Sequence, residues 1–169
     1  MKLTVTTDNL KRLLAFWIAT TCAALATHAA EPWQVVTVTK VSLEGTLKEG
    51  TEFEVRIESK KPKELSGSYF GATDQPGSVV SEITVKLGGE TISFPKQAFS
   101  DLANALLQTV SITSNPSGEA RLRFTGGTGS TSYEAEYFIE PKRLAKRVIS
   151  YFEATTGGEK SRVLKTTTF

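Results

Sequence analysis

Residues 83–94 read Ile-Thr-Val-Lys-Leu-Gly-Gly-Glu-Thr-Ile-Ser-Phe, and this stretch decides the class of fold. Apolar and polar side chains alternate on both sides of the Gly-Gly pair, which is typical of two antiparallel strands joined by a two-residue turn. Three cross-strand pairs follow from such a turn: Leu87 with Glu90, Val85 with Ile92, and Ile83 with Phe94. A shift of one residue would put these side chains on opposite faces, so the pattern predicts the register of a β-hairpin.

Alternation of this kind recurs along most of the chain. Between Thr51 and Ser59, for example, three apolar side chains alternate with glutamate and arginine, which is typical of a strand with one face in water. The expected strands cover residues 35–47, 51–59, 83–87, 90–94, 107–113, 120–124, 133–139, 144–153 and 161–167. Residues 144–153 also fit a helix, but the turn before them suits a hairpin and no helix cap precedes them.

Eight or nine short strands with turn signals between them predict a single all-β domain over residues 31–169. We expect an antiparallel β-sandwich, with an immunoglobulin-like arrangement as the first choice and a small barrel as the second. One short helix is expected near residues 96–104, because apolar side chains spaced three and four apart follow Pro95. The connection over residues 60–78 is unusually long, so it holds either a short strand near residues 68–71 or a functional loop.

Residues 1–30 have the composition of a cleaved signal peptide: a basic start, an apolar run over residues 13–26, and small residues after it. We expect cleavage after Ala29 or Ala30. The apolar run has 14 residues, whereas a membrane-spanning helix needs about 20, so an uncleaved anchor is the less favoured alternative. Lipidation at Cys22 is disfavoured, because the residue before it is larger than such sites normally have. We therefore expect export to the periplasm or the exterior of a bacterial cell, with no membrane span after cleavage.

The rarest reactive side chains all lie in this leader. Met1, Cys22 and His28 are the only methionine, cysteine and histidine of the chain. Residues 31–169 therefore lack the means for a disulfide, a nucleophile–histidine pair or a common zinc site. The leader also holds three of the 20 basic and one of the 18 acidic side chains, so the remainder is formally neutral, with 17 of each. These features predict a protein that is not an enzyme, has no cofactor or metal, and binds no nucleic acid.

One arrangement for hydrolysis remains, a pair of carboxylates. Glu134 and Glu136 are two positions apart on an expected strand, which puts them on one face. Their separation of about 7 Å lies in the range that inverting glycosidases use. The same spacing occurs at Glu52 and Glu54 on an ordinary wet face, so a carboxylate-only hydrolase is the least favoured function.

Aromatic residues give the main indication of binding. Tyr69 and Phe70 lie in the middle of the long connection, and Trp33 lies near the start of the expected mature chain. Exposed aromatic side chains stack on sugar rings or anchor a partner protein. Ordinary packing is the alternative for all three, since large aromatic side chains are most often buried.

Charge is distributed unevenly along the chain. Residues 31–140 contain 10 basic and 15 acidic side chains, whereas residues 141–169 contain seven basic and two acidic ones. A basic docking surface would use four side chains close together in the sequence: Lys142, Arg143, Lys146 and Arg147. The alternative is that this segment lies against the acidic remainder of the domain, because charged runs are usually solvated faces.

Together these features predict an exported, non-catalytic binding or accessory module with a protein or polysaccharide partner. A carbohydrate-binding domain that uses its aromatic residues is the main alternative function.

Overall fold

The computed structural model describes residues 38–63, 68–154 and 160–169. Two antiparallel sheets contain most of these residues. The expected leader over residues 1–30 and Trp33 lie outside the described residues. No helix within the described ranges is long and apolar enough to span a membrane.

The first sheet has four strands, which lie side by side in the order of the chain. They are β1 (Lys40–Thr46), β2 (Glu52–Lys60), β3 (Val79–Leu87) and β4 (Glu90–Ile92). The pairing of β1 with β2 confirms the first expected hairpin. On β2, apolar side chains such as Val55 are buried and the charged ones between them are more exposed, as the alternation predicts.

The second sheet has five strands, again in the order of the chain. They are β5 (Ala105–Ser114), β6 (Ala120–Gly126), β7 (Tyr133–Glu140), β8 (Arg143–Ala154) and β9 (Lys160–Thr168). The segment whose spacing also fitted a helix is therefore a strand, β8, which pairs with β7 on one side and β9 on the other. The strand β9 is an edge of this sheet.

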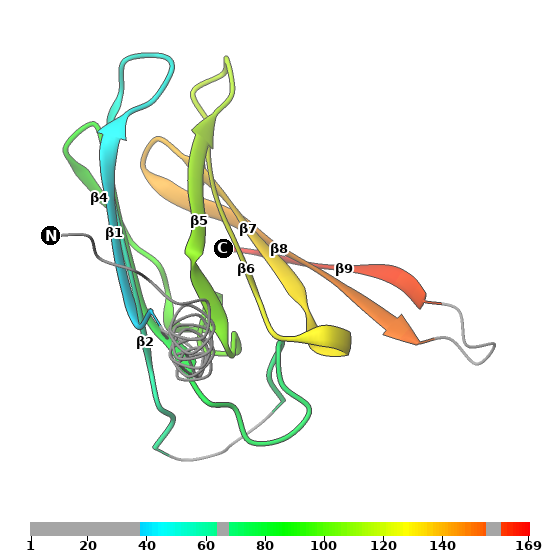
Figure 1. Ribbon diagram of the computed structural model, residues 1–169. Coiled ribbons are helices and arrows are strands. Elements are labelled where there is room, and N and C mark those ends of the chain that lie inside the picture. The colour runs from blue at the N-terminus through cyan, green and yellow to red at the C-terminus, as the bar shows by residue number, and fades with distance from the viewer. Residues whose placement is uncertain (1–37, 64–67, 155–159) are drawn as a thin grey trace, which may run out of the picture. The chain divides into compact units, whose positions relative to one another are not determined.

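The two sheets pack face to face around one core, and Figure 1 shows β1, β2 and β4 in one layer and β5 to β9 in the other. Val55 and Ile57 from the first sheet and Leu122, Phe124 and Tyr137 from the second are fully buried in this core. The expected all-β antiparallel sandwich is thereby confirmed. The immunoglobulin-like first choice does not match the strand order, because each sheet is a simple meander, whereas an immunoglobulin domain mixes early and late strands within each sheet.

The decisive hairpin has the register that its sequence predicts. Val85 pairs with Ile92 and Leu87 pairs with Glu90. Both glycines of the loop have positive φ, 57° and 84°, as a two-residue turn of this type requires. The third expected pair does not form, because β4 ends at Ile92. Phe94 instead packs its ring against Tyr137 of the second sheet, with 5.4 Å between ring centroids.

The short helix expected near residues 96–104 is a single 3₁₀ turn, η1 (Lys96–Ala98). Beyond it the backbone pairs with distant segments: Leu102 forms a parallel bridge with Phe70, and Ala103 forms an antiparallel bridge with Val79. These hydrogen bonds between segments far apart in sequence replace the ones that a longer helix would make within itself.

A bulge interrupts the pairing of β5 with β6. Leu106 pairs with Thr125, but the next pair is Ser111 with Arg123, so four residues of β5 lie opposite one residue of β6. The Thr109 hydroxyl fills the gap. It donates to the carbonyl oxygen of Leu106 at 2.7 Å and accepts from the backbone N–H of Thr125 at 2.9 Å.

Replacing Thr109 with valine is expected to lower the free energy of unfolding by about 1 kcal/mol, because valine keeps the shape but leaves the Thr125 N–H without its acceptor. Thr109→Ser retains the hydroxyl and is expected to stay within about 0.5 kcal/mol of the wild type. Urea denaturation followed by circular dichroism measures both. Equal stability of the valine and serine variants would show that the hydroxyl does not support the bulge.

Candidate functional site

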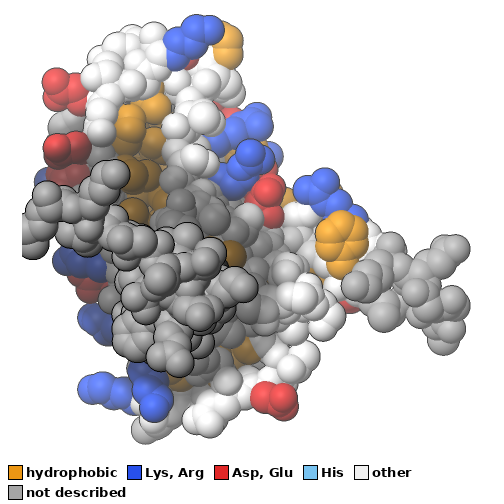
Figure 2. Space-filling model, viewed as in Figure 1, with side chains coloured by type: hydrophobic (Ala, Val, Ile, Leu, Met, Phe, Trp, Pro, Cys, Tyr) orange, Lys and Arg blue, Asp and Glu red, His pale blue; other side chains and the backbone are white. Residues whose placement is uncertain are grey.

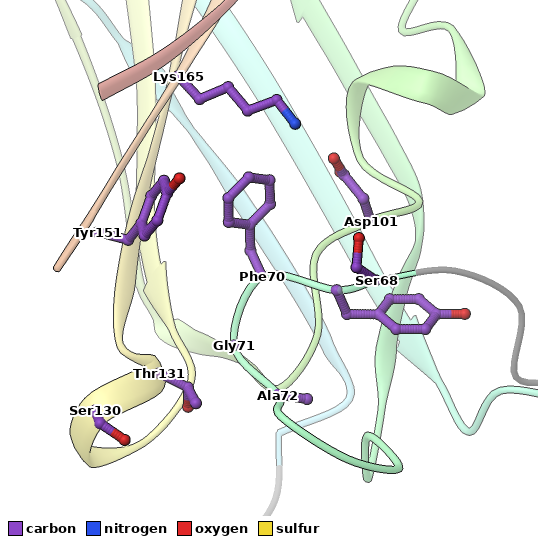
Figure 3. A pocket seen from close by; sticks show the side chains of 10 residues that line it. Ser68, Phe70, Gly71, Ala72, Asp101, Ser130, Thr131, Tyr151 and Lys165 are labelled. Atoms are coloured by element: carbon purple, nitrogen blue, oxygen red, sulfur yellow. The ribbon is translucent and has the colours of Figure 1, made fainter. Parts of the chain in front are cut away.

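A pocket of about 400 Å³ lies where residues 68–72 approach the second sheet (Figure 3). Its walls come from the long connection between β2 and β3, from the segment before β5, and from β8, β9 and the short turn η2 (Gly129–Thr131). The lining residues whose chemistry matters most are Tyr69, Phe70, Asp101, Thr131, Tyr151 and Lys165. The short strand expected near residues 68–71 is reduced to an isolated bridge at Phe70, and the connection lines this pocket.

Backbone hydrogen bonds hold Phe70 in place. Its N–H donates to the carbonyl of Asp101 at 2.9 Å, and its carbonyl accepts from the N–H of Ala103 at 2.8 Å. The chain is thereby fixed against the segment before β5, although no regular strand forms there.

The Asn104 side chain holds the rest of the connection. Its Nδ2 donates to the carbonyl of Gly71 at 3.0 Å, and its Oδ1 accepts from the N–H groups of Gly77 and Ser78 at 3.0 and 3.2 Å. Asn104 itself has a φ of 49°, a left-handed conformation that asparagine adopts more readily than most residues. One side chain therefore fixes both ends of residues 71–78.

Aromatic rings form one wall of the pocket. The rings of Phe70 and Tyr151 lie 5.2 Å apart between centroids, and Phe70 also lies 6.5 Å from Tyr133. Lys165 extends from β9 over the Phe70 ring, with its Nζ 5.3 Å from the ring centroid. Figure 3 shows Tyr151 on one side of Phe70 and Asp101 on the other.

Asp101 forms an ion pair with the buried side chain of Arg147. The guanidinium of Arg147 donates to both carboxylate oxygens of Asp101, with 2.9 Å between Nη2 and Oδ2. Nη1 also donates to the carbonyl of Ala98 at 3.0 Å, and the Tyr137 hydroxyl donates to the same oxygen at 2.8 Å. This cluster ties the segment before β5 to the inner face of the second sheet.

The two tyrosines of this region stay protonated at ordinary pH. Burial raises the pKa of Tyr133 and of Tyr137 above the usual value of 10.0, and the Asp101 charge raises both further, while the Arg147 charge opposes the shift. The Tyr133 hydroxyl and the Nε of Arg147 are buried and have no hydrogen-bond partner among the described residues. Two buried donors therefore lie near the Asp101 side of the pocket.

Of the residues singled out from the sequence, Tyr69 and Phe70 line the pocket and are half-buried. Arg147 does not belong to the expected basic surface, because only 3% of its side chain is exposed. It shares the inward face of β8 with Ile149, and the period of the strand places it there.

The other three basic residues do not form an isolated positive patch. Lys142 lies 3.9 Å from Glu90, and the Nε of Arg143 donates to Glu140 at 2.7 Å. The Nζ of Lys146 lies 4.2 Å from the centroid of the Phe138 ring. The first two contacts match the interpretation that the basic segment lies against acidic side chains, and Figure 2 shows basic and acidic side chains interspersed on the visible face.

Of the six lining residues named above, four were not expected from the sequence: Asp101, Thr131, Tyr151 and Lys165. The sequence did contain an indication that Lys165 faces inwards. The alternation of β9 places it on the same face as Val163, which pairs with Tyr151, and so on the inward side of the sheet. A lysine at an inward position of an edge strand indicates either a snorkelling side chain or a functional group.

The expected carboxylate pair lies elsewhere. Glu134 and Glu136 are on the outward face of β7, where they lie 3.7 Å and 3.8 Å from Arg123 and Arg121. In the described part of the chain, no three His, Cys, Asp or Glu side chains are grouped so that they could hold a metal ion.

Comparison with protein-family models, curated proteins and solved structures finds no match for this chain.

Proposed function

We propose that the protein is an exported, non-catalytic binding module that holds a carbohydrate in the pocket beside Phe70. The observation that carries the proposal is the return of residues 68–72 to the second sheet. This return puts the ring of Phe70 beside Tyr151, and Tyr69, an acidic group and a basic group line the same pocket. Pockets of a few hundred Å³ that combine aromatic walls with a few polar groups are the usual form of small-ligand sites.

The lining suits a hydroxylated ring. The C–H groups of a sugar pack on aromatic faces such as those of Tyr69 and Tyr151, because the face of an aromatic ring is electron-rich. The sugar hydroxyls need acceptors, and the carboxylate of Asp101 has lone pairs beyond the two that Arg147 occupies. The hydroxyl of Ser130, on η2, adds a group that both donates and accepts, whereas the Thr131 hydroxyl already donates to the carbonyl of Thr128 at 2.9 Å.

Export and the absence of catalysis are proposed on the sequence. The leader pattern over residues 1–30 supports a secreted or periplasmic location in a bacterium. Residues 31–169 contain no histidine or cysteine and therefore no nucleophile–histidine pair, which supports a binding role rather than a reaction.

Tyr69→Ala tests the site. The variant is expected to bind a sugar recognised by the wild type about tenfold more weakly, through the loss of an aromatic contact worth ~1.4 kcal/mol. The matched control is Phe152→Ala, which removes another aromatic ring that is 55% exposed and is not part of this pocket. Isothermal titration calorimetry against a panel of mono- and disaccharides measures both.

Sugars that bind the Tyr69 and Phe152 variants equally well would place recognition outside the pocket. A panel from which no sugar binds the wild-type protein would contradict the carbohydrate assignment.

A further inference from the structure

We infer that the carbohydrate carries a carboxylate, and that this carboxylate pairs with the ammonium group of Lys165. The inference rests on the proposed function and names the ligand class of the same pocket, an acidic sugar such as a uronic acid. It follows from the charges that line the pocket and from the way each is already partnered.

The charge of Asp101 is already compensated. Both of its carboxylate oxygens accept hydrogen bonds from Arg147, whose side chain is 3% exposed, so the two groups act as one neutral unit at the pocket wall. Asp101 keeps 30% of its side chain exposed, and its remaining lone pairs accept hydrogen bonds from hydroxyl groups. It therefore does not give the pocket a net preference for a cation.

Once Asp101 and Arg147 are counted as a neutral pair, Lys165 is the remaining charged residue of the pocket lining. Among the described residues, no carboxylate lies within 4.0 Å of its Nζ, although Asp101 lines the same pocket. The register of β9 places Lys165 opposite Ile149, a fully buried residue, and so directs its stem along the inward face. With Asp101 paired to Arg147 behind the wall, Lys165 is the charged lining residue left without an ion-pair partner among the described residues, and a negative ligand group would pair with it.

The surroundings of this ammonium group strengthen such a pair. Its Nζ lies 5.3 Å from the centroid of the Phe70 ring, a position in which the ring displaces part of its water. An ion pair gains strength where water is excluded, because the effective dielectric constant falls. A carboxylate on the ligand would meet a solvent-accessible cation whose ammonium group lies over the Phe70 ring.

The same geometry orients the ligand. Lys165 and Asp101 lie on the same pocket as the Phe70 ring, while Tyr151 lies on the other side of that ring from Asp101 (Figure 3). A sugar acid seated against the aromatic wall can place its carboxylate at Lys165 and a hydroxyl at Asp101. A neutral sugar makes only the second contact, and an amino sugar brings its charge towards Lys165 and is repelled.

Calorimetry with the full chain tests this with two matched pairs of probes: glucuronate with glucose, and galacturonate with galactose. We expect the wild type to bind the acidic member of at least one pair about tenfold more tightly, the size of one charge-assisted hydrogen bond. The preference is expected to shrink as sodium chloride rises from about 20 to about 200 mM, because salt screens the pair. The methyl ester of the preferred uronate is expected to bind like the neutral sugar.

Variants of Lys165 separate the charge from the fold. Lys165→Met keeps the length of the side chain and is expected to abolish the acidic preference, so that acidic and neutral sugars bind equally well. Lys165→Arg is expected to retain most of the preference. Lys48→Met, in the turn between β1 and β2, is the control for loss of a surface charge and is expected to bind like the wild type.

Each result decides between the two proposals. Equal binding of acidic and neutral sugars by the wild type would overturn the acidic preference and leave the carbohydrate function standing. A preference that survives Lys165→Met would also overturn the role of Lys165. Failure of all four probes to bind would overturn the inference, and failure of the wider sugar panel would overturn the function as well.

Discussion

Asp101→Asn is expected to lower the free energy of unfolding by about 3–5 kcal/mol, because it leaves the guanidinium of Arg147 buried without a counter-charge. Arg147→Met is expected to cost less, about 1–2 kcal/mol. The reason is the difference in exposure, since the Arg147 side chain is 3% exposed and the Asp101 side chain is 30% exposed. The carboxylate that remains after Arg147→Met can take up water, whereas the guanidinium that remains after Asp101→Asn cannot.

Urea denaturation at neutral pH measures both variants. The double variant Asp101→Leu/Arg147→Met is expected to fall within about 1–2 kcal/mol of the wild type, because replacing both members of a buried ion pair by apolar residues removes the cost of desolvating them. An Arg147→Met variant less stable than Asp101→Asn would show that the carboxylate, and not the guanidinium, is the more deeply desolvated partner.

Gly71→Ala is expected to lower the free energy of unfolding by about 2–4 kcal/mol. The φ of Gly71 is +89°, and a Cβ there would lie 2.4 Å from the carbonyl oxygen of Ala103 and 2.6 Å from Cε1 of the Tyr133 ring. The first is a backbone atom that cannot rotate away. The side chain therefore adds overpacking, typically ~1–3 kcal/mol, to the conformational cost of a positive φ.

Gly50→Ala is the matched control. Gly50 has nearly the same φ, +86°, but no atom lies within 4 Å of its Cβ position. This variant is expected to lose only the conformational part, about 1–2 kcal/mol. Thermal and urea denaturation of the two variants measure the difference, and the Gly71 variant should also bind ligand more weakly because residues 68–72 must shift. Equal losses at both glycines would show that the close approach at Gly71 relaxes without cost.

Much of the fold could be predicted because its signals are local. The pairing of Val85 with Ile92 follows from alternation and from two glycines that tolerate positive φ, all within a dozen residues. Prediction from local sequence fails at Phe94, because the same alternation predicts that Phe94 belongs to the strand, whereas β4 ends at Ile92. Its ring packs on Tyr137 of the other sheet, so a contact between layers decides where the strand ends.

The buried position of Arg147 was indicated by the period of its strand, but the basic residues around it in the sequence favoured a surface position. Its basic neighbours suggested a surface role, whereas the period of β8 groups Arg147 with Ile149 and Tyr151, both of which point inwards. The side-chain period of a strand is a geometric constraint, while the clustering of charge along a sequence is only a tendency. The strand period therefore places Arg147 in the interior, despite its basic neighbours in the sequence.

The pocket could be predicted only in part. Tyr69 and Phe70 stood out because they are aromatic residues in a long polar connection. Asp101 and Lys165 could not be assigned to the same site, because they meet Phe70 only through the bridge near Leu102 and the curvature of the second sheet. Neither contact leaves a periodic pattern in the sequence.

The meander order of both sheets has a consequence for how the chain folds. Every strand in either sheet pairs with its neighbour in sequence, so the second sheet can form from local hairpins, whereas the first sheet also requires closure of the long connection between β2 and β3. The pocket, by contrast, needs Phe70 from before β3 and Lys165 from the last strand. It is complete only when the first and last parts of the chain have docked. A ligand that binds there stabilises the docked state alone, and so couples binding to contacts between residues far apart in the sequence.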